Sequence, residues 1–174
     1  MITGTDLVEL QLRVASGGSV PEQDAISIDG HAVEARLYAE DPESGFLPST
    51  GRLERLDLPA GADVRVDSGV AEGGEVTLHY DPMIAKIITH GATRAEALSR
   101  LSRALREETR VWPVKTNAGF LDRAATHPAF TEFAVDTRFI EREQDTLVPT
   151  GEPREMLALA ALAEMGGGPV AAAG

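Results

Sequence analysis

Two charged side chains lie where their neighbours predict a buried strand and a tight turn. Arg36 lies inside the alternating run His31–Glu40, and Asp81 follows Tyr80 between two strand-like stretches. Arginine keeps its charge, and its planar guanidinium can hold an oxyanion or a carboxylate through two hydrogen bonds. Arg36 and Asp81 are therefore the candidate site residues, and anion binding is the chemistry that Arg36 could supply.

A purely structural role for the same residues stays open. Arg36 could pair with Glu34 or Tyr38 on a wet sheet face, and Asp81 could make the turn before Pro82. Glu34 lies two residues before Arg36 and points to the same strand face, because side chains alternate along a strand. Glu34 could thus steer the guanidinium, or it could simply keep the surface polar.

General catalytic motifs are absent from the sequence. There is no phosphate-binding loop, nucleophile elbow, helical zinc motif or dinucleotide fingerprint. With no cysteine, the chain has no thiolate nucleophile, and its four histidines lack the i, i+4 spacing of a helical metal pair. We therefore expect neither a metal site nor a self-contained active site.

Composition bounds the class of protein. The 174 residues are 43% hydrophobic and 25% charged, which is typical of one soluble domain. Sixteen Lys and Arg against 28 Asp and Glu give a net charge of −12, which disfavours nucleic acids and anionic membranes as partners. The sequence shows neither a signal peptide nor an apolar run of about 18–20 residues, so it predicts no membrane segment and a cytoplasmic location.

The periodicity of apolar residues predicts a mixed α+β fold. Thr3 and Asp6 resemble a capping box before a short helix that stops at Gly17-Gly18. A loop after residue 40 should be anchored by Phe46. Period-two patterns predict strands, assembled into an antiparallel sheet, at 31–40, 53–58, 64–70, 75–80 and 83–89.

Helical periodicity returns in the second half of the chain. Thr93 and Glu96 predict a capped helix whose apolar face carries Leu98, Leu101 and Leu105. A short strand at 110–114, a helix after Thr116-Asn117 that ends near His127-Pro128, and a helix at 137–144 capped by Asp136 should follow. We expect one domain over residues 1–147, then a helical segment from Pro153 and a Gly/Ala-rich, linker-like tail within 148–174.

Several motifs follow one another in a specific order. They are TGTDLVELQ (3–11), GHAVEARLYAEDP (30–42), FLPSTG (46–51), YDPMIAK (80–86), TN (116–117), HPAF (127–130) and DTRFI (136–140). Together they resemble the C-terminal domain of biotin carboxylase over residues 1 to about 145. Within that family, the motif sequences are most similar to those of the biotin-containing alpha subunits of bacterial acyl-CoA carboxylases of the methylcrotonyl-, propionyl- and acetyl-CoA types.

The resemblance implies a ligase reaction. Biotin carboxylases are ATP-grasp enzymes that use ATP and bicarbonate to make carboxyphosphate and then carboxylate N1′ of biotin on a carrier domain. The resemblance implies that Arg36 is catalytic and faces the ureido oxygen of biotin. It also implies that Asp81 lies near Arg36 and holds its guanidinium in position, and that Glu34 is a further neighbour of this group. A fixed guanidinium beside an oxygen that gains negative charge stabilises the transition state more than the ground state.

The resemblance also implies an incomplete enzyme. The family's N-terminal domain, ATP-grasp lid and metal-binding glutamates lie upstream of the position that matches Met1, so ATP and Mg should be bound mainly there. Expected partners are those upstream regions, a biotin carboxyl carrier domain and a carboxyltransferase subunit, and homodimerisation is left open. By itself the chain should not make carboxyphosphate.

Two other classes of function remain as alternatives. The chain could be a noncatalytic assembly or dimerisation module, or a truncated and inactive fragment in which the motifs serve folding alone. It could also be a small protein that binds biotin or a carrier without turnover. The effect of removing the Arg36 guanidinium discriminates among these alternatives.

Overall fold

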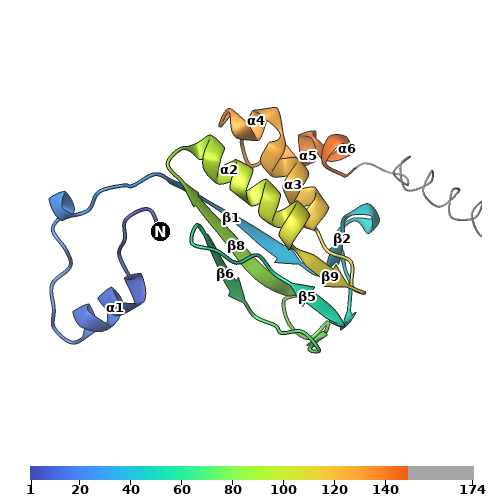
Figure 1. Cartoon of the computed structure of the whole chain (residues 1–174), viewed down its shortest axis with the longest axis horizontal. Helices are drawn as coiled ribbons and strands as arrows, with labels where there is room; N and C mark the ends of the chain where they lie inside the picture. The colour runs from blue at the N-terminus through green and yellow to red at the C-terminus, as the bar shows by residue number, and fades with distance from the viewer. Residues whose placement is uncertain (149–174) are drawn as a thin grey trace, which may run out of the picture.

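A computed structural model describes residues 1–148 of the chain. Its elements in chain order are α1 (Leu7–Ala15), η1 (Gln23–Ala25), β1 (His31–Tyr38), β2 (Glu40–Asp41), η2 (Pro42–Ser44), β3 (Leu47–Pro48), β4 (Gly51–Arg52), β5 (Arg55–Asp57), β6 (Val64–Ser68), β7 (Glu75–Val76), β8 (Met83–Gly91), α2 (Arg94–Arg103), η3 (Ala104–Glu108), β9 (Arg110–Trp112), α3 (Ala118–Thr126), α4 (Pro128–Thr131), α5 (Phe139–Arg142) and α6 (Gln144–Leu147). The helix and the tail expected after Pro153 lie outside the described residues. Figure 1 shows an arm with α1 and η1, joined by an extended segment to a body that holds the other elements.

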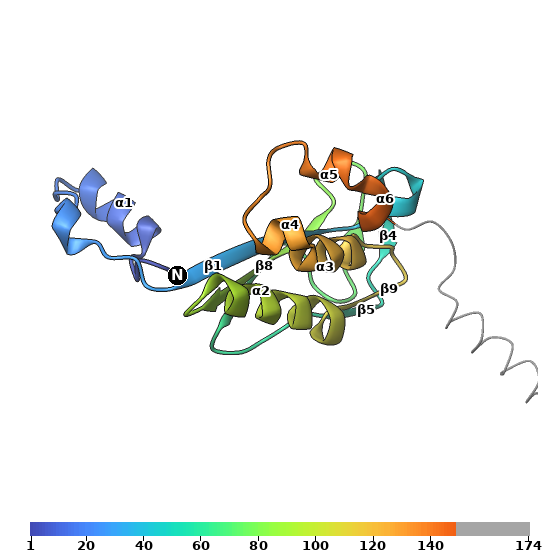
Figure 2. The same ribbon diagram turned by 90° about the horizontal axis from the view of Figure 1, so that it is seen from above.

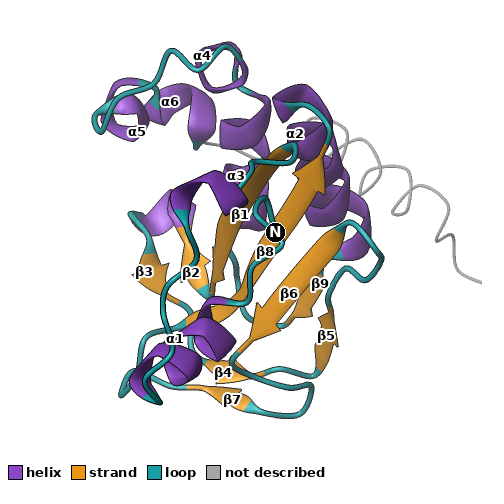
Figure 3. Cartoon of the chain, turned by 90° about the vertical axis from the view of Figure 1, so that its left-hand side faces the viewer, coloured by secondary structure: helices purple, strands orange, loops and turns teal. Residues whose placement is uncertain are grey.

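The centre of the body is an antiparallel sheet in the order β1-β8-β6, seen in Figure 3. Arg36 of β1 lies opposite Lys86 of β8, and Lys86 lies opposite Asp67 of β6. The register between β1 and β8 shifts at a bulge between Leu37 and Tyr38. The bulge therefore comes one residue after Arg36, following Leu37.

Side chains of β1 alternate between two environments, as its sequence predicts. Ala35 and Leu37 are buried, whereas Glu34 and Arg36 are exposed. Helix α2 lies across the buried face of the sheet, as the view from above in Figure 2 shows. The core cluster consists of Ala35, Leu37, Ala39, Leu53, Val76, Ile84, Ala85, Ile87, Leu98, Leu101, Ala104, Leu105, Val114 and Ala125.

The predicted cap of α2 is confirmed. The amide of Glu96 donates to the Thr93 hydroxyl over 3.2 Å, while the Glu96 carboxylate accepts from the amide of Ala92 over 2.9 Å. Thr93 thus satisfies one donor that the first helical turn leaves without a helical partner, while Glu96 bonds back to the residue before the cap. The apolar side chains predicted to face the core, Leu98, Leu101 and Leu105, are buried.

The α+β fold with an antiparallel sheet is confirmed, but the predicted strands do not all join one sheet. Three two-stranded ribbons, β2–β3, β4–β7 and β5–β9, surround the central sheet. The strand expected at 75–80 ends at Val76. Leu78 and Tyr80, which a continued strand would place on the buried face of Val76, are exposed instead. The following Pro82 lacks a backbone donor, which disfavours continued pairing at this end.

A second apolar cluster joins α3 to the C-terminal helices. It contains Phe120, Phe139, Leu147 and Val148 as its buried members. The ring of Phe46 meets the ring of Phe120 edge to face, with centroids 5.0 Å apart. Phe46 therefore anchors the loop after β2, as predicted.

Two predicted helix starts need correction. Helix α1 is capped by Asp6, whose Oδ1 accepts from the amides of Val8 and Glu9 over 2.9 Å each, and not by Thr3. The helix expected at 137–144 begins only at Phe139, because the Asp136 carboxylate accepts from the amide of Arg138 and makes a turn first. It is also divided at Glu143 into α5 and α6.

The arm contributes nothing to the core of the body. None of the α1 side chains is buried, and Leu7, Val8 and Leu12 are each more than 60% exposed. Within residues 1–148, no helix is long and apolar enough to cross a membrane.

Candidate functional site

Arg36 lies on the exposed face of β1, and its side chain is 59% accessible to solvent. Its Nε donates to Oε1 of Glu34 over 3.2 Å. This hydrogen bond, with a smaller contribution from the Tyr38 hydroxyl, raises the pKa of Arg36 above its usual value. The guanidinium is therefore charged, accessible and available to an anionic group.

Asp81 lies between the turn at residues 78–80 and Pro82, and it is also exposed. Its Oδ2 accepts from the Tyr38 hydroxyl over 3.4 Å, and no ion pair joins Asp81 to Arg36 within 4.0 Å in the described part of the chain. The expected direct contact between Asp81 and the guanidinium is therefore not made. Tyr38 touches Asp81 and interacts with Arg36, so it stands between the two.

Glu40 is a site residue that the sequence did not single out. It is half-buried, and burial raises the pKa of its carboxyl, with a further contribution from the charge of Asp81. The signal was present in the alternation of the 31–40 run, since Glu40 continues the face of Arg36 and Tyr38. A carboxyl with an elevated pKa that lines a cavity is typical of functional clefts, but such carboxyls are also found in structural networks.

An apolar cavity of about 510 Å³ opens beside β1. The strand forms one wall, and α3, α4 and α5 contribute the other. Its polar lining residues are Glu34, Arg36, Tyr38, Glu40 and Asn117, and its aromatic ones are Phe46, Phe120, Phe130 and Phe139. A mostly apolar hollow with a few convergent polar groups is the usual form of a small-molecule site.

Asn117 is a further residue that lines the cavity, and sequence reasoning assigned it only the role of a helix cap. It occupies the N-cap position of α3, but its side chain makes no capping hydrogen bond. Instead the side chain is buried and bonds to the main chain of β1. No spacing along the sequence could reveal this contact, because the partners lie about 80 residues apart.

The metal-binding capacity of the described residues is low. Within residues 1–148 there is no group of three or more His, Asp or Glu side chains that could hold a metal ion. His90 instead bonds to the carbonyl of Asp29 over 2.8 Å, and His127 lies 3.6 Å from a Glu143 oxygen. These histidines make local contacts.

Much of the chain is similar to proteins of known family. The biotin carboxylase C-terminal domain matches residues 34–142. The mitochondrial methylcrotonoyl-CoA carboxylase subunit alpha of Oryza sativa subsp. japonica is 47% identical over 152 residues, 86% of this chain and 20% of that subunit. Biotin carboxylase 2 of Bacillus subtilis (strain 168) is 47% identical over 142 residues, 81% of this chain and 32% of that protein.

Solved structures share the fold. A complete multifunctional pyruvate carboxylase from Rhizobium etli superposes with a TM-score of 0.85 and 34% identity, covering 94% of this chain and 17% of that one. The biotin carboxylase domain of a thermophilic 2-oxoglutarate carboxylase bound to bicarbonate gives a TM-score of 0.81 at 34% identity, covering 86% of this chain and 34% of that one. The chain spans between 20% and 32% of the curated relatives described above.

Proposed function

This chain belongs to the biotin carboxylase C-terminal domain family, and we propose that it works as the C-terminal part of a biotin carboxylase subunit of an acyl-CoA carboxylase. The reaction is the ATP- and bicarbonate-dependent carboxylation of biotin on a carrier domain. The observation that carries this proposal is the exposed, charged Arg36 among the residues that line an apolar cavity.

Arg36 is the proposed catalytic residue. When N1′ of biotin loses its proton, negative charge grows on the ureido oxygen. A guanidinium that already points to this oxygen stabilises the charge without reorganising, and such donors are worth about 3–4 kcal/mol of barrier. The accessible side chain of Arg36 supports this role, since a buried arginine could not meet a group brought in by a carrier.

The cavity beside β1 suits the rest of the ligand. Biotin joins a polar ureido group to an apolar bicycle and chain, and the lining of the cavity is apolar apart from the polar side chains grouped on β1 and Asn117. In this proposal Arg36 contacts the ureido oxygen, and the apolar lining accepts the hydrocarbon part.

ATP and Mg are proposed to bind mainly outside the region that this chain shares with its relatives. The enzyme as a whole would also need a carrier domain that brings biotin and a carboxyltransferase subunit that uses carboxybiotin. The biotin carboxylase domain of 2-oxoglutarate carboxylase from Hydrogenobacter thermophilus is a dimer in its complex with MgADP, ADP and bicarbonate. We therefore keep a homodimer among the proposed assemblies.

Glu34 and Asp81 are proposed to orient Arg36 by different routes. Glu34 contacts the guanidinium directly. Asp81 acts through Tyr38, whose hydroxyl donates a hydrogen bond to the Asp81 carboxylate. Removing one carboxylate leaves the other route intact, so Glu34→Gln or Asp81→Asn should each reduce biotin turnover less than Arg36→Ala does.

The experiment places the chain in a complete enzyme. We would replace the matching region of Bacillus subtilis biotin carboxylase 2 with this chain and measure carboxylation of free biotin. In that chimera, Arg36→Ala should lower kcat about 10²–10³-fold, because one preorganised donor is lost. Bicarbonate-dependent ATP cleavage should stay measurable, because it needs no biotin.

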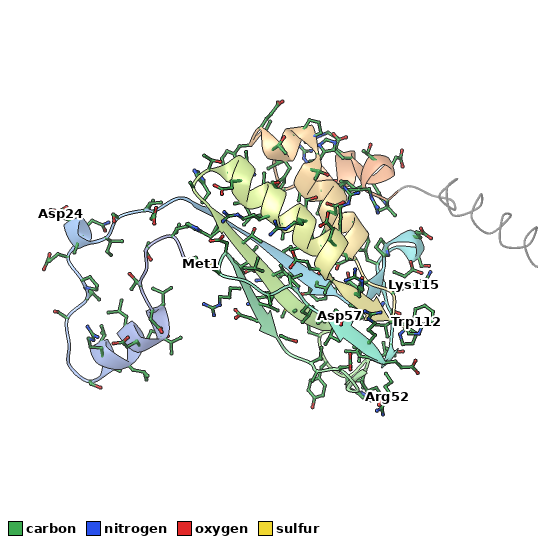
Figure 4. The ribbon with its side chains drawn as sticks, in the orientation of Figure 1. Met1, Asp24, Arg52, Asp57, Trp112 and Lys115 are labelled. Atoms are coloured by element: carbon green, nitrogen blue, oxygen red, sulfur yellow. The ribbon has the colours of Figure 1, made fainter. Side chains whose placement is uncertain are left out.

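Arg55→Ala is the matched control. Arg55 pairs with Asp57 two residues away, and the exposures of this pair, 59% and 40%, equal those of Arg36 and Glu34. Asp57, labelled in Figure 4, lies on β5, and neither Arg55 nor Asp57 lines the cavity. Equal effects of Arg36→Ala and Arg55→Ala, or a folded chimera that cleaves ATP without carboxylating biotin, would favour the noncatalytic assembly module instead.

A further inference from the structure

The side chain of Asn117 is bonded to the end of β1 at the place where Arg36 leaves the sheet. The amide of Tyr38 donates to Oδ1 of Asn117 over 2.9 Å, and Nδ2 of Asn117 donates to the carbonyl oxygen of Arg36 over 3.2 Å. The backbone amide of Asn117 also donates to the carbonyl of Tyr38 over 3.2 Å. Three hydrogen bonds thus join one residue to a segment of three.

The carboxamide takes the place of a peptide group of a neighbouring strand. β1 is an edge strand of the sheet, so one row of its main-chain groups has no partner strand. A carboxamide offers one acceptor and one donor, and only one orientation of it can serve both the Tyr38 amide and the Arg36 carbonyl. Buried main-chain groups left without such partners would destabilise the strand end.

The hydrogen bonds of Asn117 lie at the end of β1, where the pairing of β1 with β8 is irregular. The bulge between Leu37 and Tyr38 interrupts the register with β8 one residue after Arg36. Within the described residues, the only ion-pair partner of Arg36 is Glu34, on the same strand. The direction of the guanidinium therefore depends on the backbone of β1 as well as on its contacts with Glu34 and Tyr38.

The segment that carries Asn117 is itself anchored. The amide of Lys115 donates to the Ser49 hydroxyl over 2.9 Å, and the Lys115 ammonium lies 2.7 Å from Oδ2 of Asp41 (Figure 4). The amide of Ser49 in turn donates to the carbonyl of Ala39 over 2.8 Å. Asn117 therefore bonds β1 from a fixed position.

We infer that Asn117 is a positioning residue for biotin carboxylation, one that holds the main chain of Arg36 so that the guanidinium faces the cavity. This inference rests on the proposed function of Arg36. Asn117 does not touch the reacting atoms; it acts through the strand. Its loss should therefore change the turnover of biotin and leave the use of ATP and bicarbonate unchanged.

The first test uses the 174-residue chain and nuclear magnetic resonance. Asn117→Ala removes both side-chain bonds and should expose the Tyr38 amide to hydrogen exchange and shift the Arg36 Nε signal. Asn117→Asp keeps the acceptor for Tyr38 and removes the donor to Arg36. It should therefore preserve protection of the Tyr38 amide and still shift the Arg36 signal.

Thr89→Val controls for loss of stability alone. Thr89 is buried and donates one hydrogen bond, over 2.8 Å, to the carbonyl of Ala97, and it contacts neither Arg36 nor Asn117 through any bond of its side chain. This variant should lower the unfolding temperature and leave the Arg36 signal in place. If both Asn117 variants leave the Arg36 signal unchanged, or if Thr89→Val moves it equally, the inference is overturned.

The kinetic arm uses the chimera. Asn117→Ala should lower kcat for free biotin at least tenfold, with the KM for ATP and bicarbonate-dependent ATP cleavage within twofold of the unsubstituted chimera. Adding Asn117→Ala to Arg36→Ala should cause little further loss, because the two act as a unit. Unchanged turnover in Arg36→Ala defeats the proposed function; full loss there with normal turnover in Asn117→Ala defeats only the positioning role.

Discussion

Charges around the end of β1 decide what the cavity can bind. The pKa of Arg36 is raised by Glu34, so the guanidinium stays positive wherever the chain folds. Glu40 is the opposite case, since burial disfavours its charged form and raises its pKa, and Asp81 adds repulsion. Of the residues that line the cavity, Arg36 is thus a permanent cation, and Glu40 is a carboxyl whose neutral, protonated form is favoured by its surroundings.

The folding stability of Glu40→Gln should therefore depend on pH in a defined direction. The folded chain keeps the Glu40 proton to a higher pH than the unfolded chain, so wild-type stability falls as pH rises between the two pKa values. At pH 7 the variant should be more stable by about 0.5 kcal/mol or less, because solvent screens a partly exposed carboxyl. Chemical denaturation at several pH values measures this gap.

The gap should close below the pKa of an unfolded glutamate, where both states are protonated. Glu132→Gln serves as the control, because Glu132 is exposed and its carboxylate makes no ion pair within the described chain. A constant gap between Glu40→Gln and wild type from pH 3 to pH 7 would contradict the assignment.

Elements with a strong repeating pattern were predicted well from the sequence. The alternation of Val33, Ala35 and Leu37 marks the buried face of β1, and the spacing of Leu98 and Leu101 marks that of α2. In both cases a local period equals the geometry of the element, so neighbours in sequence carry the information. The same reasoning overestimated the strand at 75–80, which pairs only through Glu75–Val76.

The site could be predicted only in part, because its contacts join distant parts of the chain. The family motifs pointed to Arg36 and Asp81 as candidate residues. The structure places Arg36 on strand β1, as predicted, and Asp81 directly after the turn at residues 78–80. The carboxamide of Asn117, in contrast, had an ordinary local explanation as a helix cap. Its bonds to Arg36 and Tyr38 depend on how α3 packs against β1, which no local pattern encodes.

The N-caps of α2 and α1 should differ in their effect on the whole fold. Thr93→Ala should lower the free energy of unfolding by about 1 kcal/mol, because α2 covers the sheet. Asp6→Ala removes two bonds to α1 amides, yet α1 buries no side chain, so the global unfolding temperature should not change. Thermal unfolding followed by tryptophan fluorescence from Trp112 measures both.

Local helicity completes this comparison. A nine-residue helix without tertiary packing is marginal in water, so α1 amides should exchange rapidly in wild type. Thr3→Ala is the matched control, since Thr3 does not cap α1. Slow exchange throughout α1, or a lower unfolding temperature in Asp6→Ala, would indicate packing of the arm against the body.

At the scale of the whole molecule, the arm and the body have different characters. The body buries an apolar core between the sheet and α2, whereas the arm buries none of its α1 side chains and leaves Leu7, Val8 and Leu12 exposed. The chain also spans only 20% to 32% of relatives such as the rice and Bacillus subtilis proteins. Exposed apolar side chains grouped on one element are typical of a surface that another segment or protein covers.

The net charge should decide whether this exposed surface leads to self-association. At pH 7 the formal charge of −12 repels one copy from another, and this repulsion vanishes near the sequence pI of about 4.7. Light scattering of the 174-residue chain should therefore rise between pH 7 and pH 5. The doubly substituted chain Val8→Ser/Leu12→Ser should scatter less, because both side chains are about two-thirds exposed on α1. The control Leu47→Ser/Leu78→Ser removes equally exposed leucines from the body, and an equal reduction there would show that association does not depend on the arm.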